Sequence, residues 1–196
     1  MKLLLASSSR YRKTLLDRLQ LDFETDVPDV DESRLAGESP TALVRRLAHD
    51  KAHAVSKRHA ESLIIGSDQV AIVGDSVLGK PGNFDNNVEQ LSRLSGRAVQ
   101  FLTGLCLLNS ENGEEQLDVV EFDVVFRALS RAQIEVYVRR EKPFDCAGGF
   151  RSEGLGISLF ESMRGDPTAL IGLPLIRLVK MLDGQGVDVL AHAQAR

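Results

Sequence analysis

The stretch LIIGSDQVAIVGDSVLGKP, residues Leu63 to Pro81, decides how the rest of the chain is organised. Its first apolar run, Leu63 to Ile65, predicts a buried strand. The run stops at Gly66-Ser67-Asp68-Gln69, and the strand pattern resumes over Val70 to Val73. A carboxylate such as that of Asp68 is costly at the end of a buried strand unless it is paired or holds a metal. The stretch therefore predicts a core strand that carries an acid with a partner.

The second half of this stretch predicts a short hairpin. The chain turns at Gly74-Asp75, returns through Val77-Leu78 and ends at Lys80, which lies between a glycine and a proline. Asp68 and Lys80 then flank the hairpin, an arrangement that suits a metal-activated water beside a phosphate. An ordinary hairpin with a surface acid and a surface lysine fits equally well, so this stretch alone leaves both interpretations open.

A strand and a serine-rich turn open the chain. Residues Lys2 to Ala6 predict a buried strand, and Ser9 is a good N-cap for a helix that runs to about residue 19. Arg10, Arg12 and Lys13 fall in the first turn of that helix, where the helix dipole disfavours positive side chains. A bound anion would offset this repulsion, and phosphate is the leading candidate. A basic surface turn without a ligand is the alternative.

The remaining chain alternates between helix and strand patterns and indicates a mixed α/β protein with no internal repeat. A glycine-rich segment, Asp145 to Gly156, fits either close approach to a ligand or tight turns. The other expected elements are a strand over Phe23 to Val27, a helix capped by Ser39 with Pro40 at its first position, a helix over Phe84 to Leu94, strands over Val99 to Leu108 and Val119 to Phe126 joined at Asn112-Gly113, a helix capped by Ser130 and ending near Arg140, a strand over Ile157 to Phe160, and a last helix after Gly172-Leu173-Pro174.

Composition and charge limit the classes of function. The 196 residues are 43% hydrophobic, which is enough for one sizeable core, and carry a net charge of −4. A negative net charge argues against general binding of nucleic acid, which favours strongly basic surfaces. The apolar run Leu3 to Ala6 is too short for a signal peptide or a membrane span, so a cytoplasmic protein with no membrane partner is expected.

The cysteines and histidines form no zinc motif in the sequence. Cys106 and Cys146 lie far apart in apolar surroundings, which favours reduced core thiols. His49 and His53 are four residues apart on a helix pattern, as metal ligands can be, but the HExxH arrangement is absent. A solvated helix face is therefore the preferred interpretation of this pair.

Seven segments, taken together and in order, resemble the Maf family of nucleoside triphosphate pyrophosphatases. The resemblance extends from about residue 2 to residue 182 and looks closest to the YceF-type branch, whose members resemble 7-methyl-GTP pyrophosphatases. The chain departs from the family at Arg10, where proline is usual, and at Tyr11, where that branch often has tryptophan. The segments are Leu5-Ala-Ser-Ser-Ser-Arg-Tyr-Arg12, Asp31-Glu32, Leu47-Ala-His-Asp-Lys51-Ala52, Ile65-Gly-Ser-Asp68-Gln69, Gly79-Lys80-Pro81, Cys146-Ala-Gly-Gly-Phe150 and Gly172-Leu-Pro174.

The resemblance implies one domain over residues 1–196, with a long, twisted mixed sheet, flanking helices and two lobes around a deep cleft, as in Maf and inosine triphosphatase-like folds. It implies hydrolysis of the α–β phosphoanhydride of a nucleoside triphosphate, most of all 7-methyl-GTP, to the monophosphate and pyrophosphate. It also implies a divalent cation, Mg²⁺ or Mn²⁺, and a possible homodimer. There are two alternatives. One is a pyrophosphatase for dTTP, UTP or other nucleotides, and the other is a nucleotide-binding regulator of cell division without significant turnover.

The resemblance also implies roles for individual residues. Asp68 would be the general base and would hold the cation together with Glu32. Tyr11, Gln69 and Glu153 would distinguish the base of the nucleotide. The triphosphate would be bound by Ser7, Ser9, Arg12, Lys13, Lys51 and Lys80.

Overall fold

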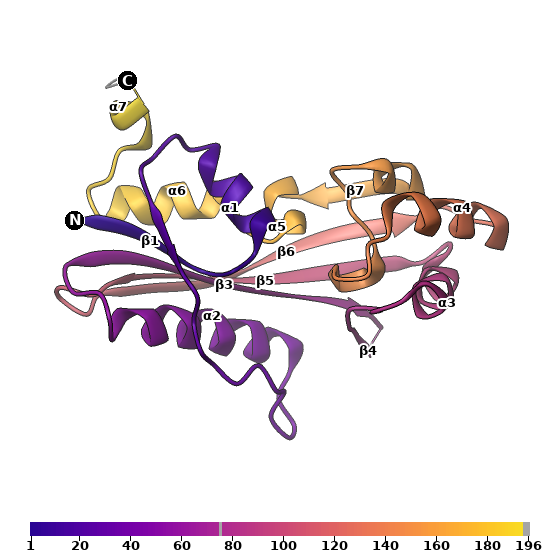
Figure 1. The fold of residues 1–196 in the computed structure, drawn as a ribbon, viewed down its shortest axis with the longest axis horizontal. Coiled ribbons are helices and arrows are strands. Elements are labelled where there is room, and N and C mark those ends of the chain that lie inside the picture. The colour runs from indigo at the N-terminus through magenta and orange to yellow at the C-terminus, as the bar shows by residue number, and fades with distance from the viewer. Residues whose placement is uncertain (75, 194–196) are drawn as a thin grey trace.

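Three long antiparallel strands form the middle of the sheet and run through the length of the molecule (Figure 1). They are β3 (Ser62–Val73), β5 (Ala98–Asn109) and β6 (Glu115–Phe126). The computed structural model describes residues 1–74 and 76–193, except for the side chains of residues 192 and 193. β3 and β5 are rich in branched aliphatic residues and are buried along most of their length, as expected for strands covered on both faces.

The outer strands make the sheet mixed. The order is β2-β1-β3-β5-β6-β7, and β4 pairs separately with β3. β1 runs parallel to β2 and to β3, whereas β4 and β7 are antiparallel to their neighbours. The bounds of these strands are β1 (Lys2–Ala6), β2 (Glu24–Asp26), β4 (Ser76–Leu78) and β7 (Phe160–Gly165). The predicted mixed sheet is therefore confirmed.

Helices cover the two halves of the sheet differently (Figure 1). In the half that holds β1, α2 lies on one face, and α1 and α6 lie on the other. In the opposite half, α3 packs against α4. None of the described helices is long and apolar enough to cross a membrane. The bounds are α1 (Arg10–Asp17), α2 (Pro40–Ser56), α3 (Phe84–Leu94), α4 (Arg131–Glu141), α5 (Pro167–Ile171), α6 (Leu175–Gly184) and α7 (Val189–Ala193), with short 3-10 turns η1 (Ala147–Gly149) and η2 (Leu155–Leu159).

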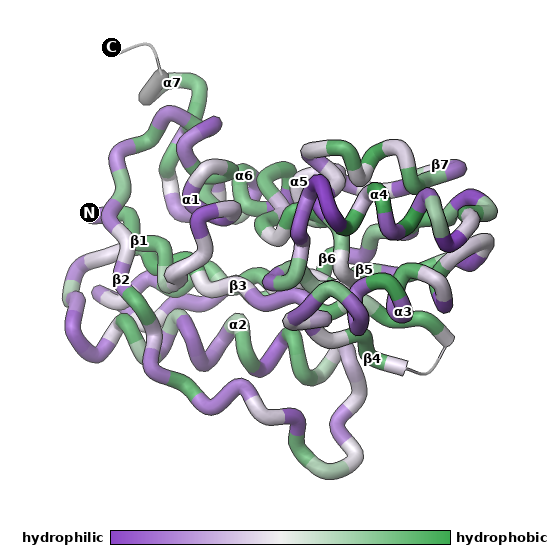
Figure 2. The backbone as a smooth tube through the Cα atoms, turned by 45° about the vertical axis from the view of Figure 1, so that its right-hand side comes forward, coloured by the Kyte–Doolittle hydropathy of each residue, from purple (hydrophilic) through white to green (hydrophobic). Residues whose placement is uncertain are grey.

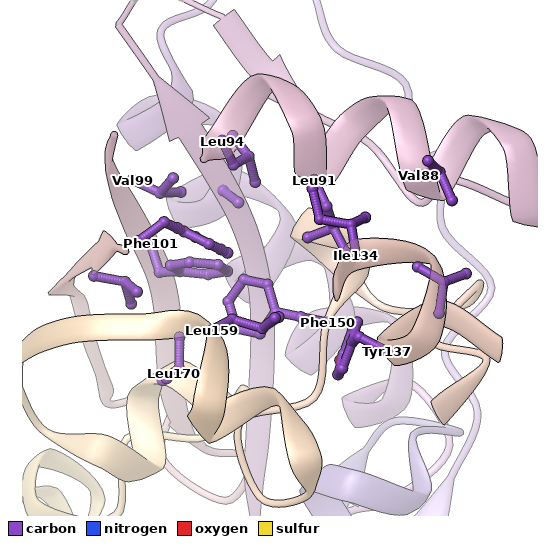
Figure 3. Close-up of a cluster of buried hydrophobic side chains, with 14 of the residues drawn as sticks. Val88, Leu91, Leu94, Val99, Phe101, Ile134, Tyr137, Phe150, Leu159 and Leu170 are labelled. Carbon is purple, nitrogen blue, oxygen red and sulfur yellow. The ribbon is translucent and has the colours of Figure 1, made fainter. Parts of the chain in front are cut away.

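An aromatic cluster fills the half of the molecule that holds α3 and α4 (Figure 3). The ring of Phe150 meets Phe101 and Phe126 edge to face, with ring centroids 5.5 Å apart in each pair. Leu91 from α3 and Ile134 from α4 close over these rings. Burying one such side chain contributes about 1.5–3 kcal/mol, so this cluster fixes the position of the loop that carries Phe150.

Two glycines let α2 pack very close to the sheet. A Cβ atom at Gly66 would lie 2.1 Å from the carbonyl oxygen of Ala48, and one at Gly104 would lie 2.1 Å from that of Val44. Ser39 caps the helix by accepting the amide N–H of Ala42. Figure 2 shows hydrophobic and hydrophilic stretches alternating along α2, as expected for a helix with one face on the sheet.

Strand β3 does not stop at Gly66, contrary to the sequence-based expectation. Residues 66–69 pair in register with residues 106–103 of β5, and Asp68 lies opposite Gly104. The glycine serves the close approach of α2 rather than a break in the strand. β3 and β4 form the predicted hairpin, whereas Asp75 of the predicted turn lies outside the described residues.

The strand predicted over Ile157 to Phe160 begins only at its last residue. Ile157 lies in the 3-10 turn η2, is 52% exposed and donates its N–H to the carbonyl of Gly154. A Cβ at Gly156 would come within 2.0 Å of the Arg151 carbonyl oxygen, so the chain is folded tightly back on itself here. This tight turn, which packs Gly156 against the backbone of Arg151, overrides the β propensity of the apolar run.

Candidate active site

A cavity of about 680 Å³ lies between the β1–α1 turn, α2, the β3–β4 hairpin and the glycine-rich loop. Phe101 and Phe150 of the aromatic cluster also line it. Lys13 is exposed and is not among the residues that line the cavity. The other predicted site residues all line it: Ser7, Ser9, Tyr11, Arg12, Glu32, Lys51, Asp68, Gln69, Lys80 and Glu153.

Lys51 connects the two predicted carboxylates. Its Nζ atom lies 2.7 Å from Oδ1 of Asp68 and 2.6 Å from Oε1 of Glu32. Lys51 is only 5% exposed and Asp68 only 9%, so each of these charges needs the other. Burial alone would raise the pKa of Glu32, but the hydrogen bond and charge of Lys51, together with Lys80 and Arg12, hold that pKa below its ordinary value. The carboxylate of Glu32 can therefore stay ionised at the wall of the cavity.

The two carboxylates fit a hard divalent cation. Each gives one oxygen to Lys51, and within the described part of the chain the second oxygen of each has no hydrogen-bond or ion-pair partner. Mg²⁺ and Mn²⁺ prefer oxygen ligands and are commonly held by one or two carboxylates plus substrate phosphates. Asp68 and Glu32 supply such a donor set on the wall of the cavity.

The serine-rich turn holds Arg12 on the wall of the same cavity. Ser9 caps α1 by accepting the N–H of Arg12, and its own N–H donates to Oγ of Ser7 at 3.1 Å. Nε of Arg12 donates to the carbonyl of Gly172 at 2.9 Å. Burial lowers the pKa of the Arg12 guanidinium, while Asp68 and Glu32 act in the opposite direction. The turn therefore presents a fixed cation and the start of a helix to the cavity, which suits an anion.

Ser67 is a positioning residue that the sequence did not single out. Its hydroxyl lies 2.9 Å from the carbonyl of Gly104 and 3.1 Å from that of Gly172. It thereby shares the Gly172 carbonyl with Arg12 and joins β3 to the end of α5. Its place beside Asp68 in the GSDQ segment was the available signal.

Two of the predicted specificity residues, Tyr11 and Glu153, have different surroundings. Tyr11 is contacted by two guanidinium groups, with the carbon of Arg10 4.9 Å and that of Arg151 5.9 Å from the ring centroid. Burial raises the pKa of Tyr11. Glu153 is exposed at the edge of the cavity, and its carboxylate lies 3.4 Å from the hydroxyl of Ser152. The face of the Tyr11 ring can therefore accept a cation. Arg151, to which the sequence analysis gave no role, is a further neighbour of this ring.

Gln69 is already engaged by the fold. Its amide nitrogen lies 3.0 Å from Oγ1 of Thr103 and 2.6 and 3.1 Å from the carbonyls of Ala169 and Leu170. These contacts tie β3 to α5. Its N–H groups are therefore used within the protein, and the carbonyl oxygen is the group it could offer to a ligand.

Comparison with known proteins places the chain among nucleotide-hydrolysing relatives. Residues 2–185 match the family described as Maf-like protein. The chain is 60% identical over 188 residues to a 7-methyl-GTP pyrophosphatase of Pseudomonas putida, covering 95% of this chain and 98% of that protein. Proteins with the same name from Alcanivorax borkumensis and Pseudomonas aeruginosa are 57% and 53% identical over 188 residues; each alignment covers 95% of this chain, and 95% and 98% of the relative.

Proposed function

The chain belongs to the Maf family, and on that premise we propose that it hydrolyses the α–β phosphoanhydride of 7-methyl-GTP to 7-methyl-GMP and pyrophosphate. One structural observation supports this proposal most strongly. A buried carboxylate, Asp68, is held by Lys51 on the wall of a cavity that also gathers Arg12 and Lys80. A general base that shares a cavity with several cations suits attack of water on a phosphate chain.

The proposed chemistry assigns one proton transfer and one bond exchange. Asp68 accepts a proton from a water molecule as the water oxygen bonds to the α-phosphorus. The bond from that phosphorus to the bridging oxygen breaks, and pyrophosphate leaves with the electron pair. Arg12, Lys51 and Lys80 neutralise the charge that grows on the phosphate oxygens in the transition state, and hydrogen bonds already hold Arg12 and Lys51 in place for this role. Lys51 also holds the Asp68 carboxylate in place, because its Nζ donates to Oδ1 of Asp68 at 2.7 Å.

We propose that Asp68 and Glu32 bind Mg²⁺ or Mn²⁺ together with the substrate phosphates. When bound, such a cation lowers the pKa of a water molecule and polarises a phosphate oxygen. The two carboxylates share Lys51, so they lie side by side on the wall of the cavity. Chelation should therefore abolish turnover, and adding Mg²⁺ back should restore it.

We propose that Tyr11 and Glu153 recognise the methylated base. A 7-methylguanine ring is cationic, and a cation gains roughly 0.5–2 kcal/mol on an aromatic face. The guanidinium of Arg10 lies against the Tyr11 ring in this structure. The cationic base would therefore replace one cation on that ring with another. Glu153 can accept both N–H groups of the guanine edge in charge-assisted hydrogen bonds. Gln69 would offer only its carbonyl oxygen to the base or sugar.

Direct measurement of products tests the proposed activity. Pyrophosphate and 7-methyl-GMP are measured after incubating 7-methyl-GTP with the wild-type chain and with Asp68→Asn, in H₂¹⁸O. The proposal expects stoichiometric amounts of both products, the heavy oxygen in 7-methyl-GMP, and a large loss of rate in the variant. Tight nucleotide binding without product from the wild type would instead identify a regulator that lacks turnover.

We also propose that the protein acts in the cytoplasm on a small-molecule nucleotide, forms one domain over residues 1–196, and uses no nucleic-acid or membrane partner. The net charge of −4 supports the absence of a general nucleic-acid partner. A homodimer stays a prediction from the family and is checked by light scattering.

A further inference from the structure

A second group of metal-ligating side chains lies on another side of α2. His49 and His53 project from this helix toward Glu115, the first residue of β6. Nε2 of His53 lies 2.8 Å and Nε2 of His49 3.6 Å from Oε2 of Glu115. One ligand atom from each residue falls within 4.8 Å of the other two. None of the three lines the active-site cavity, so this cluster is separate from Asp68 and Glu32.

The spacing of these atoms matches a tetrahedral zinc site. Zn²⁺ binds imidazole nitrogen and carboxylate oxygen at about 2.0–2.2 Å, which places neighbouring ligand atoms of a tetrahedron about 3.3–3.5 Å apart. The two nitrogen-to-oxygen distances here, 2.8 and 3.6 Å, lie on either side of that value. The imidazole rings are stacked with centroids 4.1 Å apart, and Nε2 of each ring lies within 3.6 Å of the same Glu115 oxygen. Because the lone pair of an imidazole nitrogen lies in the plane of the ring, the stacked rings must rotate for both Nε2 atoms to bind one ion, and their 41% exposure leaves room for this rotation.

Neighbouring groups prepare two of these residues for such a role. Nδ1 of His49 lies 3.0 Å from the carboxylate of Asp50, a partner that favours the proton on Nδ1 and leaves the lone pair of Nε2 for a metal. The buried thiol of Cys106 lies 3.7 Å from Oε2 of Glu115 and helps to orient that carboxylate. A ligand set supported by outer hydrogen bonds of this kind is typical of a metal site.

We propose that His49, His53 and Glu115 bind one divalent transition-metal ion of the Zn²⁺ class, apart from the catalytic cation. Two imidazole nitrogens favour zinc, copper or nickel over Mg²⁺, which prefers an all-oxygen set. The side chains of both histidines are 41% exposed and that of Glu115 is 26% exposed, so a fourth position is open to water. The ion clamps α2, which carries Lys51, to the start of β6.

Calorimetric titration of Zn²⁺ into the untagged, metal-free full chain, with excess Mg²⁺ present, tests this proposal. We expect one saturable site, weakened at least about tenfold by Glu115→Gln and by His53→Ala. His59→Ala is the matched control, because His59 also lies 2.8 Å from a carboxylate, that of Asp26, but stacks on no second imidazole among the described side chains. This control should bind Zn²⁺ as the wild type does.

Two further measurements keep the result interpretable. The Asp68→Asn variant should retain the Zn²⁺ site, and Co²⁺ bound to the wild type should give the intense visible absorption of a tetrahedral complex, lost in Glu115→Gln. Hydrolysis of 7-methyl-GTP with Mg²⁺ by Glu115→Gln shows that this variant is folded. The proposal is overturned if the wild type shows no saturable Zn²⁺ binding, if binding is equal in Glu115→Gln, or if it disappears in Asp68→Asn. His49 and His53 would then only contact the carboxylate of Glu115, without binding a metal ion.

Discussion

Gly104→Ala tests whether the position of α2 matters for activity. The substitution adds one methyl group under α2 and removes no functional group from the site. The new Cβ would lie 2.1 Å from the carbonyl oxygen and 2.6 Å from the carbonyl carbon of Val44, both backbone atoms of α2. Reaching the 3.4 Å of ordinary contact requires α2 to retreat from the sheet by about 1.3 Å. Lys51 lies on the same helix, and its 2.7 Å contact with Asp68 would be broken by a movement of that size.

The expected loss has two parts. Overpacking of this kind costs typically about 1–3 kcal/mol in the free energy of unfolding. A misplacement of about 1 Å at a catalytic group can cost about 10²-fold in rate. We therefore expect Gly104→Ala to remain folded, to unfold at lower denaturant, and to lose about 10²-fold in kcat/KM for 7-methyl-GTP.

Denaturant unfolding and pyrophosphate release, measured on the same samples, check both parts. Gly184→Ala is the control, because the atoms nearest to its Cβ belong to the side chain of Gln116, at 3.3 Å, and neither residue lines the cavity. It should keep full turnover. If Gly104→Ala loses stability but turns over 7-methyl-GTP like the wild type, the close packing of α2 does not position Lys51 and this reasoning is wrong.

Three other substitutions address single groups. Asp68→Asn should lower kcat by about 10²–10⁴-fold while nucleotide affinity changes far less, since it removes the base and keeps the shape; equal turnover would exclude Asp68 as the base. Arg12→Ala should cost about 10²–10³-fold in kcat/KM, whereas Arg131→Ala, on the exposed face of α4, should cost nothing; similar effects of the two would mean that the β1–α1 turn is only a charged surface. The hydrogen bond from Arg46 holds the pKa of Glu38 at about 2, below its ordinary 4.5. The folded state is therefore stabilised above pH 4.5, and this contribution is lost as the pH falls toward 2. The unfolding midpoint of Glu38→Gln should accordingly lie below that of the wild type at pH 7, and the gap should close on acidification; a gap that is constant with pH would contradict this.

Local signals in the sequence predicted most helix starts. Ser39 and Ser130 both cap helices as expected, and Ser130 forms the full capping box with Gln133. These motifs work because donor and acceptor lie within four residues of each other. The turn geometry at Ile157, by contrast, depends on backbone contact with a residue outside the apolar run, and the strand expected there was wrong.

Residues whose role depends on distant packing could not be read from periodicity. Gly66 looked like the end of a strand, whereas its function is to admit α2. Lys51 looked like a solvated helix lysine, and only the family resemblance marked it; its 5% exposure follows from the close packing of α2. The pair of His49 and His53 was visible in the sequence, but Glu115 lies more than sixty residues away and joins them only through the pairing of β5 with β6.

Competition in a single tube tests the central claim most directly. Equal concentrations of 7-methyl-GTP, GTP, UTP and dTTP are mixed with the wild-type chain and Mg²⁺, and the initial loss of each is followed chromatographically, which gives the ratios of kcat/KM. Our account predicts that 7-methyl-GTP is consumed clearly first and that Glu153→Gln and Tyr11→Ala each reduce its lead over GTP. Faster consumption of UTP or dTTP by the wild type would contradict it.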